Sequence, residues 1–464
     1  MFGLLGHSPT GTLCLSDLTG SILLDIQHAR PIPSLDASWF TPGMLVLAEG
    51  TYEEDYSNST SLGNMGGVGG TINGRFLAFS IAHPPCERRS ETLGITDPLN
   101  KSGEIHGPAF GWTDFLGVGS ERATGSRMRK LQKQAFGPES DYVENGRVVI
   151  AGEVNLDNPA VLGGLRAMLE TYSSLPPSQI PMAIVLIGNF ASRAVMSGAT
   201  GAGSIEYKEC FNSLAAVLSE VPQLIARTTL VFVPGDSDAW ASSFSGGAAA
   251  PIPRNAVPDV FTTRVKRVIA EANREVGTAK GRKEGEAVWT TNPSRFTWFG
   301  TAGEMVIFRD DISSRLRRTA VKFSNKQDGG EEDATDPTSE NPDLDNESLP
   351  DATAEATVPP VDTGISPSKR LTRTLLDQSH LSPFPLSTRP VHWDYASALS
   401  LYPVPSSLVV ADAEMPAFVE RYFGCCVMNP GRLVEGRKGD IVRWVEFDVI
   451  NGTGKVRGPD DKSS

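Results

Sequence analysis

Two carboxylates, Asp236 and Asp238, follow a short apolar run in the stretch VFVPGDSDAW at residues 231–240. The run has the composition of a buried strand, and Pro234-Gly235 ends it. In open α/β folds, the carboxyl ends of parallel strands form the edge at which binding sites are built. Because carboxylate oxygens bind divalent cations, this loop is a candidate metal site.

Two other apolar runs end in polar residues in the same way. RVVIAGEVN places Glu153 and Asn155 after one run, and PMAIVLIGNF places Gly188-Asn189 after another. The segments between the runs have the apolar spacing of helices, and Asn158-Pro159 are the residue types that begin a helix. This alternation predicts a layered α/β unit with a mainly parallel sheet.

The first 95 residues have a β pattern instead. GTLCLSDLTGSILLDI alternates apolar and polar residues around a turn at 17–20, and GMLVLAEGTYEED and GRFLAFSIA predict further strands. Several short strands in so short a segment predict a small barrel of the OB type over residues 1–95. The glycine-rich insertion at 57–74 lacks the Gly-Lys-Ser/Thr of a phosphate-binding loop. We expect Tyr52 and Phe76 in the barrel core, since few basic residues accompany them for binding single-stranded DNA.

Composition sets the remaining boundaries. We expect a connecting segment at 96–145, the α/β unit at 146–452 and a disordered tail at 453–464. An acidic, proline-rich stretch at 325–368 predicts a disordered insertion inside the α/β unit. From Gln327 to Ser368 the chain has twelve Asp or Glu and no Lys or Arg, so this stretch carries nearly all of the net charge of −13.

The remainder of the chain is close to neutral, which argues against a strongly basic nucleic-acid surface. A local basic run at 122–133 is either a solvated face or a contact to the DNA backbone. The five cysteines show no paired framework and no CxxC, so we expect reduced thiols, as in a cytosolic or nuclear protein. No apolar run approaches the roughly 18 residues of a membrane span.

The order of the strand-end loops resembles the calcineurin-like metallophosphoesterase fold, whose active members place Asp-x-His, Gly-Asp and Gly-Asn-His there. Two metals about 3.5–4 Å apart then activate a water. In this chain the three positions hold Glu153-Val154-Asn155, Gly188-Asn189 and Gly235-Asp236-Ser237. An amide replaces the bridging carboxylate and a hydroxyl replaces an imidazole. We therefore expect vestigial positions with no catalytic residue, no metal and no other cofactor. A single-metal site of Glu153, Asp236 and Asp238 is the alternative.

An OB-fold barrel followed by such a phosphoesterase domain resembles the B-subunit family of the replicative DNA polymerases. VLAEGTYEED, VLIGNF, TTNPSRFTWFGTAGEMVIFRDD and LLDQSHLSPFPLSTRPVHWDYASALSLYPVPSSLVVAD point to its epsilon branch. The resemblance implies an OB-fold barrel followed by a calcineurin-like β-sandwich flanked by helices. The small helical domain that the family carries ahead of the barrel is expected to be absent from this sequence.

The resemblance also implies a non-catalytic, nuclear scaffold. A scaffold of this kind binds the C-terminal metal-binding module of the catalytic subunit of DNA polymerase epsilon and joins the other subunits of that polymerase. Contact with the replicative helicase complex is expected, as is contact with DNA through the complex, and no contact with a membrane.

Three alternatives stay open: an active metallophosphoesterase, a single-stranded DNA-binding OB protein, and the corresponding accessory chain of another replicative polymerase. We expect His380 to bond to a backbone group in its loop. Trp393, Tyr395 and Tyr402 either cover the sheet as core or form a partner interface. We expect Trp393 in the core and leave Tyr402 open.

Overall fold

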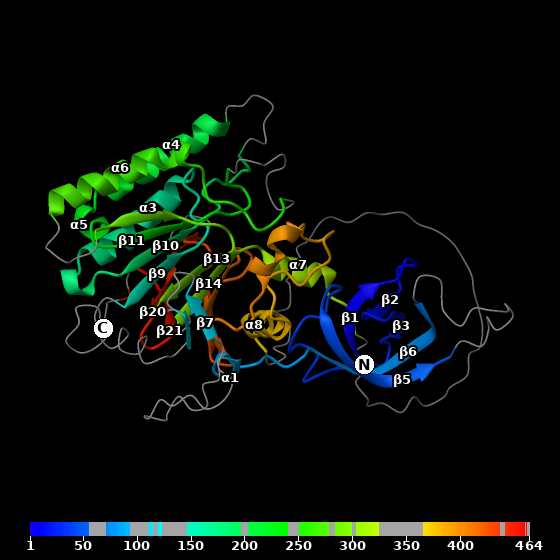
Figure 1. The fold of residues 1–464 in the computed structure, drawn as a ribbon. Helices are drawn as coiled ribbons and strands as arrows, with labels where there is room; N and C mark the ends of the chain where they lie inside the picture. Colours follow the sequence, from blue (N-terminus) through cyan, green and yellow to red (C-terminus); the bar gives the residue numbers. More distant parts are fainter. Residues whose placement is uncertain are drawn as a thin grey trace, which may run out of the picture.

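The structure, a computed structural model, shows a closed β-barrel beside a larger α/β unit (Figure 1). It describes residues 1–54, 71–92, 111–114, 119–122, 146–195, 203–239, 250–277, 284–298, 303–323, 365–436, 441–459 and 461.

The barrel closes because β3 pairs with β2 on one side and with β6 on the other. Its strands are β1 (Phe2–His7), β2 (Leu13–Ser16), β3 (Ser21–Asp25), β5 (Leu45–Glu53) and β6 (Thr71–Ala82), with β4 (Arg30–Pro31) along β6. The predicted hairpin is confirmed, since β2 and β3 pair in antiparallel register and the Asp17 N–H donates to the Gly20 carbonyl. Alternate side chains point inward and form the barrel core, as the period-2 pattern requires.

Two sequence expectations about the barrel need correction. Phe76 is buried, but Tyr52 is 49% exposed because the last three residues of β5 run beyond the covered part of the barrel. The predicted glycine-rich insertion includes Thr71–Gly74, which belong to β6, where Gly74 takes a positive φ of 92°. Residues 57–70 of that insertion lie outside the described residues.

The α/β unit contains two packed sheets. The first has the order β12-β11-β10-β9-β20-β21, and the second β13-β14-β15-β17-β16. The first consists of β9 (Arg147–Ala151), β10 (Ala183–Ile187), β11 (Thr229–Val233), β12 (Glu286–Trp289), β20 (Trp444–Asp448) and β21 (Thr453–Arg457). The second consists of β13 (Ser294–Trp298), β14 (Gly303–Arg309), β15 (Ser407–Ala411), β16 (Phe418–Tyr422) and β17 (Cys425–Asn429).

One hydrophobic cluster fills the space between these sheets. Ile150, Ile187 and Val233 from the first sheet pack with Ile307 and Met428 from the second. The strands β9 to β12 are parallel, as the alternation of strands and helices predicts, so their carboxyl ends share one edge.

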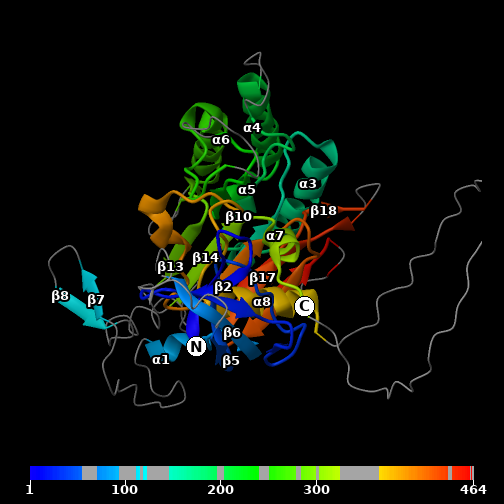
Figure 2. The ribbon, with the colours of Figure 1, turned by 90° about the vertical axis from the view of Figure 1, so that its right-hand side faces the viewer.

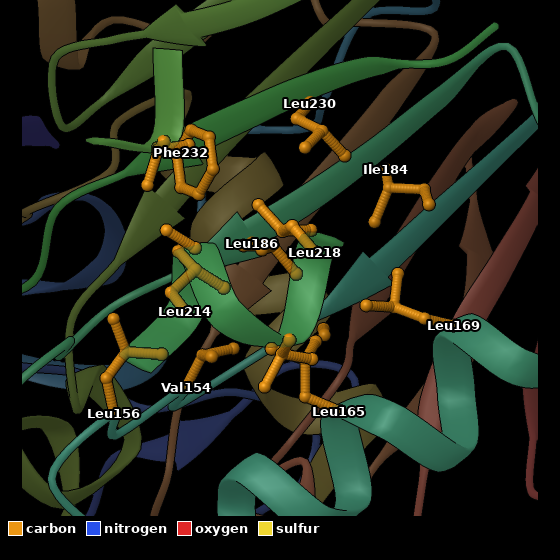
Figure 3. Close-up of a cluster of buried hydrophobic side chains, with 14 of the residues drawn as sticks. Val154, Leu156, Leu165, Leu169, Ile184, Leu186, Leu214, Leu218, Leu230 and Phe232 are labelled. Carbon is orange, nitrogen blue, oxygen red and sulfur yellow. The ribbon is translucent and has the colours of Figure 1, made fainter. Parts of the chain in front are cut away.

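Helices cover the outer face of the first sheet (Figure 1). They are α3 (Pro159–Ser173), α4 (Gly203–Ser219), α5 (Pro222–Ile225) and α6 (Asp259–Val276). The predicted start of α3 is confirmed: the Asn158 side chain accepts a hydrogen bond from the Ala160 N–H, and Pro159 is the first helical residue. Val154 and Leu156, from the loop after β9, lie in the same cluster as the α3 and α4 leucines (Figure 3).

The barrel and the second sheet share one hydrophobic cluster. It includes Leu5 and Phe40 from the barrel side, Phe308 of β14, Leu316 of α7 (Ile312–Thr319) and Leu375 of α8 (Pro367–Gln378). Both α7 and α8 lie between the barrel and the sheets (Figures 1 and 2). The two units therefore form one continuous core.

Short elements complete the fold. They are α1 (Arg89–Thr92), β7 (Gly111–Asp114), β8 (Gly119–Arg122), β18 (Val434–Glu435), β19 (Ile441–Val442), and the 3-10 helices η2 (Pro177–Gln179) and η3 (Trp393–Leu399). None of the helices in the described part of the chain combines the length and apolarity that a bilayer span requires.

Two predicted disordered segments also need correction. The disordered tail was expected at 453–464, but its first residues form strand β21. This strand pairs with β20 in antiparallel register and is the edge strand of the first sheet. The acidic insertion expected at 325–368 ends earlier, since Pro367 already begins α8. Residues 325–364 lie outside the described residues, and so does the basic run at 123–133.

Candidate functional site

The three predicted loops meet at the carboxyl edge of the parallel strands, and Asn189 joins them. Its side-chain amide donates to Glu153 Oε1 at 3.1 Å, and its Oδ1 accepts from the Ser237 N–H at 2.9 Å. The Asn155 amide donates to the Asn189 carbonyl at 2.7 Å. The amide side chains of Asn155 and Asn189 thus hydrogen-bond each loop to a neighbour.

Gly188 and Gly235 permit this close approach. A Cβ added at Gly188 would collide with the Asp238 carboxylate, and one added at Gly235 would collide with the Asn189 side chain. Both positions therefore require glycine because of the neighbouring loop.

Glu153 is paired with an arginine. Arg309, at the end of β14, donates from Nη2 to Glu153 Oε2 at 2.7 Å and from Nε to the same oxygen at 3.0 Å. The same guanidinium donates to Asp311 Oδ1 at 3.0 Å and to the Gly188 carbonyl at 3.2 Å. Its side chain is 2% exposed, so Arg309 is a buried cation that connects both sheets.

Asp236 lies among three further arginines. Arg389 Nη2 donates to Asp236 Oδ1 at 2.6 Å, and Arg315 Nη2 lies 3.9 Å from Oδ2. Arg254 donates to the backbone carbonyls of Asp236 at 2.6 Å and of Asp238 at 2.7 Å. The Asp236 loop is therefore held by guanidinium groups on both its side chain and its backbone.

Asp310 completes this network, which we call the arginine cluster: Arg254, Arg309, Arg315, Arg389, Glu153, Asp236, Asp310 and Asp311. Arg315 Nε lies 3.1 Å from each carboxylate oxygen of Asp310. Burial raises the pKa of Asp310, although the neighbouring arginines oppose this. Burial alone would lower the pKa of Arg389, but Asp310 and Asp236 reverse this and raise it. Buried charges of both signs thus stabilise one another.

Asp238 has a separate, structural role. Its carboxylate accepts hydrogen bonds from the Gly235 N–H at 2.7 Å, the Phe190 N–H at 2.9 Å and the Tyr207 hydroxyl at 2.9 Å. Burial raises the pKa of Asp238 to about 6, while these hydrogen bonds act in the opposite direction. The side chain therefore caps the loop through backbone N–H groups and the Tyr207 hydroxyl.

The residues at these positions do not fit a pair of divalent metals. The carboxylates of Glu153 and Asp236 bind guanidinium groups, and the added positive charge opposes a second cation in the same place. Among the residues that the structure describes, no group of three His, Cys, Asp or Glu is arranged to hold a metal.

No motif in the sequence pointed to the arginines of the cluster as site residues. One signal was present, because Arg309-Asp310-Asp311 directly follows the apolar run of β14 and so lies at a strand end. Arg254 and Arg389 come from irregular segments, and neither has a sequence pattern that places it near Asp236.

His380, Trp393 and Tyr402 lie apart from the arginine cluster's hydrogen bonds, each in its own surroundings. His380 bonds to backbone as predicted, since its Nδ1 accepts from the Ser382 N–H at 3.0 Å. The expectation for Trp393 was wrong: it is 82% exposed, because it begins the surface helix η3 and does not face the sheet. Tyr402 is 57% exposed, and its hydroxyl donates to Glu87 at 3.1 Å.

Comparisons with known proteins agree with one another. A family described as the B subunit of DNA polymerase alpha/epsilon matches residues 148–420, and "DNA polymerase epsilon subunit 2-like, OB-fold domain" matches residues 1–85. The DNA polymerase epsilon B subunit from Schizosaccharomyces pombe is 31% identical over 94% of this chain and 58% of its own length.

Proteins of the same name from other organisms are also similar to this chain. The one from Saccharomyces cerevisiae is 28% identical over 96% of this chain and 57% of its own, and the one from Arabidopsis thaliana is 25% identical over 93% and 62%. The chain thus spans about three fifths of the length of these relatives. Since the first match covers more than half of the chain and includes the strands that carry the arginine cluster, the chain belongs to the B-subunit family of DNA polymerases alpha and epsilon.

Proposed function

We propose that the chain is a non-catalytic accessory subunit of DNA polymerase epsilon. In this proposal the α/β unit is a calcineurin-like phosphoesterase domain that has lost its metals, and the OB-fold barrel is joined to it as a scaffold. The part of the proposal that makes the chain non-catalytic rests on one observation: Glu153 is paired with Arg309, and Asp236 is paired with Arg389. Guanidinium groups bind the carboxylates that would otherwise be free for a metal.

The proposed partners follow from the relatives. We propose that the chain binds the C-terminal metal-binding module of the epsilon catalytic subunit, together with the other subunits of that polymerase. Contact with the replicative helicase complex, contact with DNA through the complex and a nuclear location belong to the same proposal. Its support is that relatives at about 30% identity are named as the B subunit of this polymerase.

The proposed domain boundaries are a barrel at 1–95, a connecting segment at 96–145 and the phosphoesterase domain from 146. The continuous hydrophobic cluster across barrel and sheet supports a rigid pair of domains. A rigid pair offers a partner one surface of fixed shape, which lowers the entropy lost on binding.

Affinity purification of the tagged chain from its own cells tests the partner. We expect the epsilon catalytic subunit in near-equal amount at moderate salt, identified by mass spectrometry, and expect none with a tag-only control. Recovery of a different replicative polymerase would show that the chain is an accessory subunit of that polymerase instead. Recovery of the chain alone would contradict the scaffold proposal.

The rival activity is tested on the purified chain. Wild type and Asp236→Asn are each incubated with manganese, iron or zinc and a phosphodiester substrate. We expect no turnover above buffer in either. Turnover by wild type that the Asp236→Asn variant lacks would establish an active metallophosphoesterase, whereas equal turnover in both points to a contaminant.

A further inference from the structure

The outer surface of the barrel has an apolar groove over β1, β5, β6 and the residue that follows β4. The groove has a volume of about 450 Å³ and is lined by Met1, Phe2, Ile32, Leu47, Ala48, Glu49, Ser80 and Ala82. We propose that this site, which we call the barrel groove, binds an amphipathic helix of a second protein. The helix would contribute an apolar stripe with Lys or Arg beside it.

Cross-strand pairing builds the floor of the barrel groove. Phe2 lies opposite Leu47, and Leu47 lies opposite Ala82. Ile32 follows β4 and donates its N–H to the Ile81 carbonyl, next to Ala82. Residues that lie opposite each other on paired strands share one face of the sheet. Four apolar side chains therefore form one row across the barrel, close to the N-terminus (Figure 1).

The described part of the chain leaves this row open to solvent. Phe2 is 54% exposed, Ile32 49% and Leu47 39%, whereas Val46 and Ala48, on the other face of β5, are in the barrel core. The start of β5 is thus apolar on both faces, which is typical of a strand that is covered on both sides. Apolar surface gathered in this way marks an interaction site more often than a free surface.

The charges around the barrel groove favour a basic partner. The Glu49 carboxylate is exposed at the polar end of the groove and accepts from the Ser80 hydroxyl at 3.3 Å. The Met1 ammonium donates to the Ala48 carbonyl at 2.5 Å, so it is held by the backbone. Residues 1–54 contain six Asp or Glu and one Arg. A negative surface attracts Lys and Arg and raises the rate of encounter, so we expect cations beside the apolar stripe of the partner.

The size of the barrel groove favours a helix over a second copy of this chain. A stable protein interface uses about 20–30 residues on each side, whereas eight residues line the groove. A helix bound in a groove uses a few anchors at i, i+3 or i+4 and i+7, which span about 10.5 Å. The apolar row crosses three strand spacings, roughly 14 Å, and can hold such a stripe. Two copies would also bring two acidic barrels together.

The closed barrel also argues against an extended peptide. Strand β1 pairs with β2 and β5, and β5 pairs with β1 and β6. The strands under the groove therefore have neighbours on both sides and offer no free edge to which a peptide strand could be added.

The test replaces Leu47 in the full chain with the photo-crosslinker p-benzoylphenylalanine. After irradiation of its own cells, the chain is purified under denaturing conditions, and mass spectrometry identifies the attached peptide. We expect a peptide from a different protein, with apolar residues at helical spacing and a Lys or Arg within one turn of them. The same crosslinker at Leu18, which is fully exposed in the turn between β2 and β3, is the control and should not capture this peptide.

Charge reversal tests the recognition of the cation. Glu49→Arg in the crosslinking chain should lower the yield of the attached peptide about fivefold, because an exposed ion pair is replaced by repulsion. Glu54→Arg is the matched control, since Glu54 is also exposed but does not line the groove, and it should leave the yield unchanged. Circular dichroism of the two purified variants checks that the fold is kept.

Four results would overturn the proposal. They are attachment to a second copy or another segment of this chain, a captured peptide without a cation, equal yields from the two charge-reversed variants, and no attachment at position 47. The affinity purification of the epsilon catalytic subunit uses the unaltered chain. Recovery of that subunit together with no attachment at position 47 would therefore overturn the barrel groove alone.

Discussion

Arg309 connects the first sheet to the second through Glu153, and the two side chains are only 2% and 11% exposed. Arg309→Met should destabilise the chain by about 3–5 kcal/mol, because it leaves Glu153 charged and without its partner. Chemical denaturation measures the change in the free energy of unfolding.

Arg166→Met is the control for this prediction. Arg166 pairs with Glu220 at 2.9 Å, but both side chains are more than 40% exposed, so we expect a loss of only about 0–1 kcal/mol. The double variant Glu153→Gln with Arg309→Met should recover part of the loss, since it removes both charges. If Arg309→Met lowers the free energy of unfolding by less than Arg166→Met does, the cluster does not stabilise the fold.

The raised pKa of Asp238 predicts that the stability of the folded chain depends on pH. Burial raises its pKa from 3.8 to about 6, so between these values the folded chain binds more protons than the unfolded chain. Its stabilising contribution is therefore complete below about pH 4 and is lost as pH rises through about 6, amounting to about 3 kcal/mol. The measurement is the unfolding free energy of wild type minus that of Asp238→Asn across this range.

Tyr207→Phe provides the matched test of the cause. The Tyr207 hydroxyl donates to Asp238 and lowers its pKa, so its removal should move the midpoint of the pH dependence upward. A difference between wild type and Asp238→Asn that stays flat from pH 4 to 7 would contradict the assignment.

At the scale of elements, helix α8 attaches the barrel to the α/β unit. The Trp39 N–H donates to the Thr374 hydroxyl at 3.0 Å, and Gln378 exchanges two hydrogen bonds with the Leu45 backbone at 2.8 Å each. Thr374→Val keeps the shape of the side chain but leaves the buried Trp39 N–H without its acceptor. We expect a loss of about 1–3 kcal/mol in the unfolding free energy, measured by urea denaturation.

Thr319→Val is the control on the neighbouring helix. The Thr319 hydroxyl donates to the Arg315 carbonyl at 2.9 Å, which is a contact within α7 itself. A loss for Thr374→Val no larger than for Thr319→Val would mean that the hydrogen bond to Trp39 does not hold the barrel in place.

At the scale of the whole molecule, the shared hydrophobic cluster predicts that barrel and α/β unit unfold together. Phe40 is 2% exposed and packs with its ring centroid 4.3 Å from that of His83 and 5.6 Å from that of Phe323. Phe40→Ala should cost about 3–5 kcal/mol and lower one common transition in calorimetry. Two separate transitions, with only one of them shifted, would show that the units are independent.

Much of the fold could be predicted from the sequence because its patterns are local. Period-2 alternation predicted the barrel strands, and apolar runs joined by helical spacing predicted the parallel sheet with α3, α4 and α6. The loops that carry Glu153, Asn189 and Asp236 could be named for the same reason, since each directly follows its strand.

The tertiary structure alone decided what those loops contact. Arg254, Arg389 and the pair Arg309 and Arg315 come from three stretches of the chain, and no local pattern brings a distant guanidinium to Glu153 or Asp236. Exposure of Trp393 and Tyr52 was also decided by the surroundings, because an aromatic residue is buried only where another element covers it. The sequence by itself determined which elements form and where polar loops leave the sheet, whereas long-range packing determined that these loops hold a buried ion-pair cluster.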